Sequence, residues 1–295
     1  RDLLAQLVEQ RRVLHQRQEG EFIPPLHIPN REDKPVITLS VLRAAQLSEE
    51  MADLKPHMVY IPLEELTVEN KHLLEPFLGD EAITLAVRLP RVIFDGEKNE
   101  VASRLEKVRE MGIKHALVGN IGHIQFVKSL GFSARGDYGL NLFNSTSVLT
   151  ARDIGLSAAT LSFELRFEQI RDLSKPLDTE IIVYGRLPLM LLENCIIKGA
   201  HSVCACDNVT TIKDRQGESF PVVREYPHRN VVLNSKKLFL ADKMHALGRL
   251  GVWGTRLMFT TENAVECVAV LRRYMGLGDY EPGGFTRGLY TRGVE

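Results

Sequence analysis

Short runs of apolar and β-branched residues recur along the chain, and each run is nearly continuous rather than alternating with polar residues. Such runs are typical of parallel strands that are covered on both faces. Eight runs predict strands, which begin at Val36, Met58, Ala82, His115, Ala134, Ala158, Glu180 and Gly254. We therefore expect a largely parallel sheet.

Amphipathic stretches with helical spacing fill the intervals between these runs, and several of them end at glycine, a common helix stop. Eight strands that alternate with helices predict an α/β fold, namely a (β/α)8 TIM-type barrel over residues 31–295. A helical leader or linker is expected over residues 1–30. A doubly wound open sheet is the alternative, but no G-x-G-x-x-G motif follows the first strand.

The regular alternation breaks once, between the seventh and eighth predicted strands. There the chain inserts residues from about 187 to 253, which include a predicted hairpin that turns at Gln216-Gly217 and three of the four cysteines. Long insertions in compact domains usually carry function. Since the loops after the strands of a barrel form its active-site face, we expect the insertion at the functional end.

Composition narrows the class of protein. The 295 residues include 37 basic and 38 acidic side chains, so no general attraction to nucleic acid or to an acidic membrane is expected, only local patches. No apolar run approaches the roughly 18 residues of a membrane span, and no signal peptide is visible. Few cysteines and no secretion signal indicate a cytoplasmic protein. Because the sequence opens with Arg1, we expect the C-terminal part of a longer protein.

The cysteines of the insertion form the main candidate for chemistry. Cys195, Cys204 and Cys206 are close enough in sequence for their thiolates to bind one soft cation. His228 is the preferred fourth ligand, ahead of His201, because the hairpin would fold it back toward the cysteines. This set would suit zinc or an iron–sulfur cluster. The alternative is that these cysteines are small hydrophobic residues without a ligand.

Polar residues at the ends of the predicted strands form a second candidate site. They are Glu64, Arg88, Asn120, Asn141, Asn144, Glu164 and Arg186. Glu164, Arg186 and Asn144 are the predicted catalytic residues, since such groups can orient a substrate or move protons. The alternative is that they are polar because a barrel mouth faces water. The sequence contains no H-E-x-x-H, G-x-S-x-G or G-x-x-x-x-G-K motif.

Several segments resemble the collagenase-like, PrtC-type peptidase family, which is family thirty-two of the unknown-mechanism peptidases. They are "GDYGLNLFNS", "YGRLPLMLLENC", "CAC", "DRQGESFPV", "HRNVVLNS", "LFLAD" and "FTRGLYTRGVE". The resemblance covers nearly everything after about residue 31. It is strongest to the C-terminal barrel module of the longer members related to ribosomal-RNA cytidine hydroxylase proteins.

The resemblance implies a barrel and, for several members, an iron–sulfur cluster that serves hydroxylation of RNA bases or ubiquinone precursors. In the C-x4-C pair of these members, Cys195 matches the second cysteine and Met190 the first. Cys204 and Cys206 match the downstream cysteines at tighter spacing. The loss of one cysteine leaves zinc, an iron–sulfur cluster or no metal open, with His228 as the replacement ligand.

Three functions follow as hypotheses. The favoured one is a barrel module with a metal site in a protein that hydroxylates or otherwise modifies RNA bases. The second is a metal-dependent peptidase, with Glu193 or Glu164 as base. The third is a binding module for RNA or for an N-terminal barrel of the same protein, with phosphate contacts from Arg224, Arg229, Lys236 and Lys237. A peptide substrate is less favoured, and no membrane partner is expected.

Overall fold

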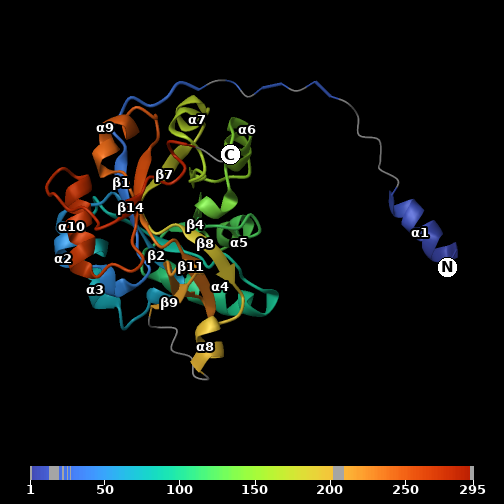
Figure 1. Cartoon of the computed structure of the whole chain (residues 1–295), viewed down its shortest axis with the longest axis horizontal. Helices are drawn as coiled ribbons and strands as arrows, with labels where there is room; N and C mark the ends of the chain where they lie inside the picture. Colours follow the sequence, from blue (N-terminus) through green and yellow to red (C-terminus); the bar gives the residue numbers. More distant parts are fainter. Residues whose placement is uncertain are drawn as a thin grey trace.

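The computed structural model describes residues 2–12, 20–21, 23–24, 26, 28–201 and 209–292. Its centre is a closed barrel of eight parallel strands (Figure 1). They are β1 (Val36–Ser40), β2 (Met58–Pro62), β3 (Thr84–Arg88), β4 (His115–Val118), β5 (Ser133–Gly136), β6 (Ala158–Thr160), β7 (Asp178–Gly185) and β13 (Gly254–Met258). Strand β13 pairs with both β7 and β1 and thereby closes the barrel. The predicted (β/α)8 barrel is confirmed.

Helices cover the outside of the barrel, as the amphipathic stretches predict. The α-helices are α2 (Glu49–Asp53), α3 (Lys71–Leu78), α4 (Lys98–Glu110), α5 (His123–Ser129), α6 (Ser145–Asp153), α7 (Phe167–Asp172), α9 (Met244–Leu247) and α10 (Ala264–Tyr274). Short 3-10 helices are η1 (Ala44–Gln46), η2 (Leu63–Glu65), η3 (Asp95–Glu97), η4 (Tyr138–Leu140) and η5 (Ala241–Lys243). Outward strand residues such as Val59 and Ile61 pack with helix residues such as Leu74 and Leu105 in one apolar core. Burial of each such side chain stabilises the fold by about 1.5–3 kcal/mol.

The interior of the barrel is built differently from this outer core. Side chains alternate along a strand, so Met58 and Tyr60 point inward while their neighbours point outward. With Ala86 and Leu117 they form a small separate apolar cluster. The rest of the interior is largely polar, and its centre is the guanidinium of Arg256 on β13, which is 1% exposed.

Arg256 binds several buried oxygen atoms at once. It donates to Asp137 Oδ1 and to Thr160 Oγ1, each at 2.6 Å, and forms an ion pair with Glu180. Burial alone would lower the pKa of Arg256, but the Glu180 and Asp137 carboxylates raise it overall. Thr38 donates to Glu180 as well. The interior thus holds a compact network of charges that neutralise one another.

The insertion between β7 and β13 forms a small antiparallel sheet. Its strands lie in the order β8 (Pro188–Leu192), β11 (Arg229–Leu233), β10 (Ser219–Glu225) and β9 (Thr210–Lys213). The hairpin predicted around Gln216-Gly217 is present as β9 and β10. The short α8 (Ile196–His201) follows β8, and β12 (Lys237–Phe239) returns to pair antiparallel with β7. Figure 1 shows this sheet beside one end of the barrel.

The two ends of the chain behave differently. Strand β14 (Phe285–Thr286) pairs with β12, and the buried Tyr290 that follows donates to the Ile182 carbonyl at 2.7 Å. At the other end, α1 (Asp2–Arg12) lies away from the barrel in Figure 1 and has no buried residue. Of the helices in the described ranges, none has the length and apolar character needed to cross a membrane.

Candidate functional site: the covered barrel mouth

The carboxyl ends of the parallel strands meet under the inserted sheet. A cavity of about 50 Å³ lies between them. Its polar lining comes from both sides, with Glu64, Arg88, Arg91, Asp137 and Tyr138 from the barrel and Arg224 and Glu225 from β10. We call this cavity the mouth. Because the loops at this end of such barrels carry the chemistry, and because the sheet closes it, the mouth is the leading candidate site.

Glu225 contributes to the mouth a carboxyl whose surroundings raise its pKa. Its Oε1 accepts the backbone N–H of Arg91 at 3.2 Å, while its buried Oε2 has no hydrogen-bond partner among the described residues. Burial raises the pKa of Glu225 and nearby Glu64 raises it further, against the opposing effects of the Arg91 amide and the Arg88 guanidinium. A carboxyl that retains its proton to higher pH is suited to act as a general acid or base.

Arg91 is held in place through its backbone and its side chain. The Arg91 carbonyl accepts a hydrogen bond from Asn120 Nδ2 at 3.3 Å, complementing the bond from its N–H to Glu225. Its side chain packs against Gly119 and Gly139, which leave room for it because they have no Cβ. A Cβ on Gly119 would lie 3.2 Å from Arg91 Cγ, and a Cβ on Gly139 would lie 3.3 Å from Arg91 Nε. The guanidinium lies 5.6 Å from the ring centre of Tyr138. The sequence therefore builds a fixed position for this cation.

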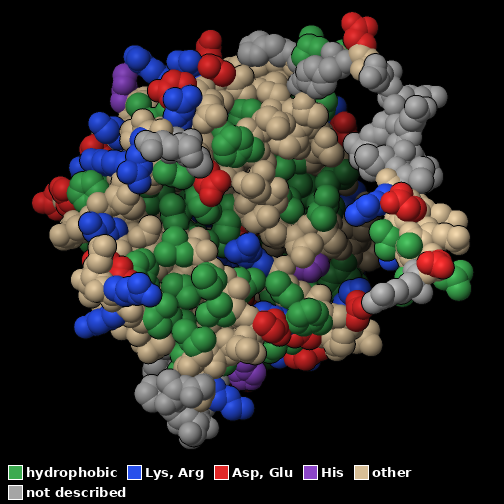
Figure 2. Space-filling model, turned by 45° about the vertical axis from the view of Figure 1, so that its right-hand side comes forward, with side chains coloured by type: hydrophobic (Ala, Val, Ile, Leu, Met, Phe, Trp, Pro, Cys, Tyr) green, Lys and Arg blue, Asp and Glu red, His purple; other side chains and the backbone are tan. Residues whose placement is uncertain are grey.

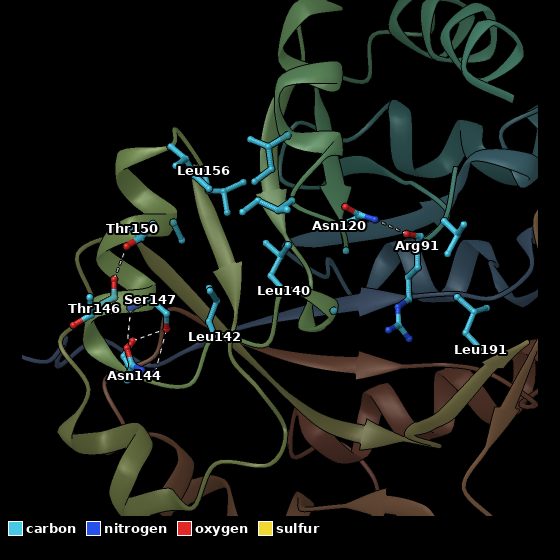
Figure 3. A pocket seen from close by; sticks show the side chains of 17 residues that line it. Arg91, Asn120, Leu140, Leu142, Asn144, Thr146, Ser147, Thr150, Leu156 and Leu191 are labelled. Atoms are coloured by element: carbon cyan, nitrogen blue, oxygen red, sulfur yellow. Dashed lines mark hydrogen bonds between the residues drawn. The ribbon is translucent and has the colours of Figure 1, made fainter. Parts of the chain in front are cut away.

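A larger groove of about 800 Å³ runs from Arg91 across the loops after β4 and β5 to α6 (Figure 3). Arg91 lines both the mouth and the groove, so the two cavities meet at its side chain. The walls are mainly aliphatic, and Leu140, Leu142 and Leu191 point toward the open space in Figure 3. Figure 2 shows hydrophobic side chains gathered on the face that carries these elements.

The sequence matches the family model described as peptidase family U32 over residues 76–279, more than two thirds of the chain. The chain belongs to peptidase family U32. No curated protein matches it. The matched span includes the barrel strands from β3 to β13 and the whole inserted sheet, so most of the mouth lies inside the U32 region, whereas its residues Leu42 and Glu64 precede that region.

Solved structures resemble this U32 barrel weakly. The U32 peptidase Mk0906 is 7% identical, with 84% of this chain and 100% of that chain covered and a TM-score of 0.45. A FabK mutant from Thermotoga maritima is 11% identical, with 77% and 62% covered and a TM-score of 0.40. The tryptophan synthase complex from Pyrococcus furiosus is 7% identical, with 83% and 94% covered and a TM-score of 0.43.

The three predicted catalytic residues lie in three different settings in the U32 barrel. Asn144 lines the groove, but its side chain caps α6 by accepting the N–H of Ser147 at 2.8 Å. Arg186 donates to the backbone carbonyls of Asn234, at 3.0 Å, and Ser235. Glu164 follows β6, is half-buried and lines neither the mouth nor the groove. The structure therefore does not bring these three side chains into one cavity.

The predicted metal ligands lie partly in the described structure. Half-buried Cys195 follows β8, and its Sγ accepts the N–H of Lys198 at 3.4 Å. His228 immediately precedes β11, and Cys195 follows β8. Asn230 of β11 pairs with Leu192 of β8, so this register places Cys195 and His228 at the same end of the two paired strands. Cys204 and Cys206 lie outside the described residues.

Within the described ranges, no three His, Cys, Asp or Glu side chains come together in a way that could hold a metal ion. The described donors therefore do not form a metal site by themselves. Met190, at the position of the missing family cysteine, lies on β8 opposite Val232 and is 56% exposed.

For two of the four predicted phosphate-binding residues, Arg229 and Lys237, the prediction is wrong because their side chains are buried in ion pairs. Arg229 pairs with Glu97 at 3.0 Å and with Glu193 at 2.7 Å, and its side chain is 2% exposed. Lys237 pairs with two glutamates beside β12. Arg229 is buried where β11 of the inserted sheet meets Glu97, and Lys237 is buried on β12, which pairs with β7, beside Glu262 and Glu266. Lys236 is exposed, and Arg224 lines the mouth.

Sequence reasoning found part of the mouth. Glu64 and Arg88 follow predicted strands and were expected at this end of the barrel. Arg91 and Glu225 were missed, since Arg91 lies in a loop and Glu225 is one of many charged residues in a hairpin. Knowledge that the hairpin folds over the barrel would have identified Glu225, because it lies on β10 directly after Val223 and Arg224, which also line the mouth.

Proposed function

We propose that this U32 barrel is a module of a protein that hydroxylates RNA bases, and that the mouth is the site that faces the substrate. The main support is the combination of Glu225, a carboxyl with a raised pKa, and two guanidinium groups at one mouth. Guanidinium groups bind phosphate, and a carboxyl whose pKa is raised holds its proton to higher pH, which suits general acid–base chemistry. Arg88 and Arg91 would hold the backbone of the RNA while Glu225 moves a proton.

The reaction requires more than these residues supply. Replacing a base C–H by C–OH with water as the oxygen source releases two protons and two electrons. Glu225 can accept one proton, and the second passes to bulk water. The electrons must pass to a two-electron acceptor, which we place outside the residues of the mouth.

The full-length protein with Glu225→Gln tests this function. The amide cannot take up the proton, so we expect hydroxylated nucleosides to fall about a hundredfold or more when the variant replaces the wild-type protein in cells. Mass spectrometry of digested RNA measures the nucleosides. Glu218→Gln changes an exposed glutamate of the same hairpin and is the matched control. RNA that is unchanged when the protein is deleted would contradict the proposal.

We also propose that Cys195, Cys204, Cys206 and His228 hold zinc or an iron–sulfur cluster. The register of β8 and β11 supports this assignment, because it places Cys195 and His228 at the same end of these two paired strands. When bound, zinc would act as a structural clip, whereas a cluster would supply electron transfer. Elemental analysis and visible absorption of anaerobically purified protein decide between them. Cys195→Ser is expected to lose the metal and Cys267→Ala, in the barrel core, to retain it; metal-free wild-type protein would overturn the assignment.

A peptidase is the alternative function, and the aliphatic groove beside the mouth favours it because it could receive apolar peptide side chains. Glu193, one proposed base, is engaged by Arg229 at 2.7 Å, which leaves Glu164 as the freer of the two. Cleavage of denatured collagen that is lost on metal removal, restored by added metal and lost in Glu164→Gln would favour a metal-dependent peptidase over RNA modification. If the protein is instead a binding module, it should bind RNA with an affinity that Glu225→Gln does not change. It should also produce no modified nucleoside.

A further inference from the structure

The groove beside the mouth has the size and lining of a small-molecule site. Its volume of about 800 Å³ falls within the range of about 300–1,000 Å³ common for such sites. Its aliphatic lining residues are Val92, Ile121, Ile124, Leu140, Leu142, Ala151, Ile154, Leu156 and Leu191. No aromatic ring belongs to this described lining, so a nucleobase would find no stacking partner there. The groove is suited to a saturated chain.

The polar side chains at the rim of the groove are already used. Asn144 and Ser147 bind each other's backbone at the start of α6, and Thr150 donates to the carbonyl of Thr146 at 2.9 Å. Asn120 accepts the N–H of Gly122 at 2.9 Å and donates to Arg91. Figure 3 shows these pairs as closed local contacts. They leave few groups to recognise a strongly polar ligand.

Arg91 is the exception among the lining residues. It is the only charged side chain among the described residues of the groove, and in Figure 3 it extends between Leu140 and Leu191. Its guanidinium forms no hydrogen bond with the described residues, although the two glycines and the Tyr138 ring fix its position. A guanidinium presented in this way is complementary to a carboxylate, which it can bind through two parallel hydrogen bonds.

We propose that the groove binds a single-chain aliphatic carboxylate, a fatty acid, with its carboxylate on Arg91 and its chain along the leucine and isoleucine side chains. This site does not use Glu225, but it shares Arg91 with the proposed RNA site, so a bound carboxylate and an RNA phosphate would compete for the same guanidinium. Titration with carboxylates in the absence of RNA tests the groove, whereas Glu225→Gln in cells tests RNA modification, so the two proposals can fail separately.

Calorimetric titration of the intact chain with hexanoate, octanoate and decanoate, below their micelle concentrations, tests the site. Each added methylene should increase affinity by about fourfold while the groove fills. Arg91→Gln should weaken decanoate binding about ten- to a hundredfold and leave decan-1-ol unchanged, because only the charge-assisted hydrogen bonds are lost. Arg272→Gln, an exposed arginine of α10, is the matched control and should have no effect.

A second variant separates chain binding from head-group binding. Ile121 is 69% exposed at the groove, so Ile121→Ser should fold normally. It should weaken decanoate and decan-1-ol alike, by about threefold to tenfold. The proposal is overturned if decanoate does not bind, if Arg91→Gln binds it as tightly as the wild type, or if a leucine-rich peptide binds the groove more tightly than decanoate.

Discussion

The interior of the barrel and its mouth use the same residue types for opposite purposes. In the interior, Arg256 contacts Asp137 and Glu180, and all three side chains are at most 6% exposed. At the mouth, Arg91 makes no hydrogen bond through its guanidinium to the described residues, and Glu225 leaves one buried oxygen without a partner. Most charged groups of the interior thus bind one another, with Arg256 Nε left over, whereas Arg91 and Glu225 each keep binding capacity that the described residues do not use.

The difference has a physical basis in desolvation. Removing a charge from water costs several kcal/mol, and only close partners recover that cost. The interior network recovers it and should therefore be rigid and structural. At the mouth, close partners recover only part of the desolvation cost. This raises the pKa of Glu225 and leaves groups that can bind a ligand. Mutations in the interior should consequently change stability, whereas mutations at the mouth should change function.

Arg256→Met should give the largest effect. It removes the cation between two buried carboxylates, so we expect the free energy of unfolding to fall by about 5 kcal/mol. Urea unfolding followed by circular dichroism measures the loss. Arg88→Gln, at the mouth, is the comparison and should change stability by no more than about 1 kcal/mol. Equal losses in the two variants would remove the distinction between interior and mouth.

The interior network also shows how far the sequence alone could reach. The runs of apolar residues and their spacing predicted every barrel strand, because a strand that is buried on both faces consists of consecutive apolar residues. They could not show that Arg256, Asp137 and Glu180 meet, since Arg256 lies on β13, Glu180 on β7 and Asp137 just after β5, and each looks like an isolated charge in its own run. Only closure of the barrel makes them neighbours.

The mouth was partly predictable for a related reason. Glu64 and Arg88 follow barrel strands, and the fold class alone places such residues at the mouth. Glu225 and Arg91 depend on how the inserted sheet docks, and that contact joins residues 134 positions apart. Such a contact leaves no local pattern in one sequence.

Lys237→Gln should give the second largest effect. Lys237 lies on β12, the strand that pairs with β7, and forms ion pairs with Glu262 at 3.0 Å and Glu266 at 2.6 Å. Since Glu262 is fully buried, losing the cation should cost about 3 kcal/mol. Its exposed neighbour Lys236, changed to Gln, should cost less than about 0.5 kcal/mol. A large Lys237 effect would show that the ion pairs beside β12 stabilise the fold as those of the interior do, and a small one would limit that behaviour to the interior.

Glu225→Gln should alter how stability depends on pH, by a smaller amount. Because folding raises the pKa of Glu225 above its ordinary 4.5, the folded chain holds this proton more tightly than the unfolded chain. The wild type therefore loses stability relative to Glu225→Gln as the pH rises above 4.5 through the folded pKa. Unfolding free energies of both proteins at pH 4 and pH 7 measure this difference, in which the other carboxyls cancel. A difference that is constant with pH would mean that Glu225 is not desolvated.

The smallest effects should come from two hydroxyls on β1. Thr38 donates to Glu180, so Thr38→Val should cost about 1–2 kcal/mol, as expected for a hydrogen bond to a charged group. Ser40 is 1% exposed, and its hydroxyl has no hydrogen-bond partner among the described residues. Ser40→Ala should therefore leave stability within about 0.5 kcal/mol of the wild type or raise it, because no bond is lost and an unpaired hydroxyl leaves the interior. Urea midpoints measure both changes. A Ser40→Ala loss as large as that of Thr38→Val would mean that the hydroxyl is paired in solution, for example with a buried water, and that the polar network of the interior extends toward the mouth.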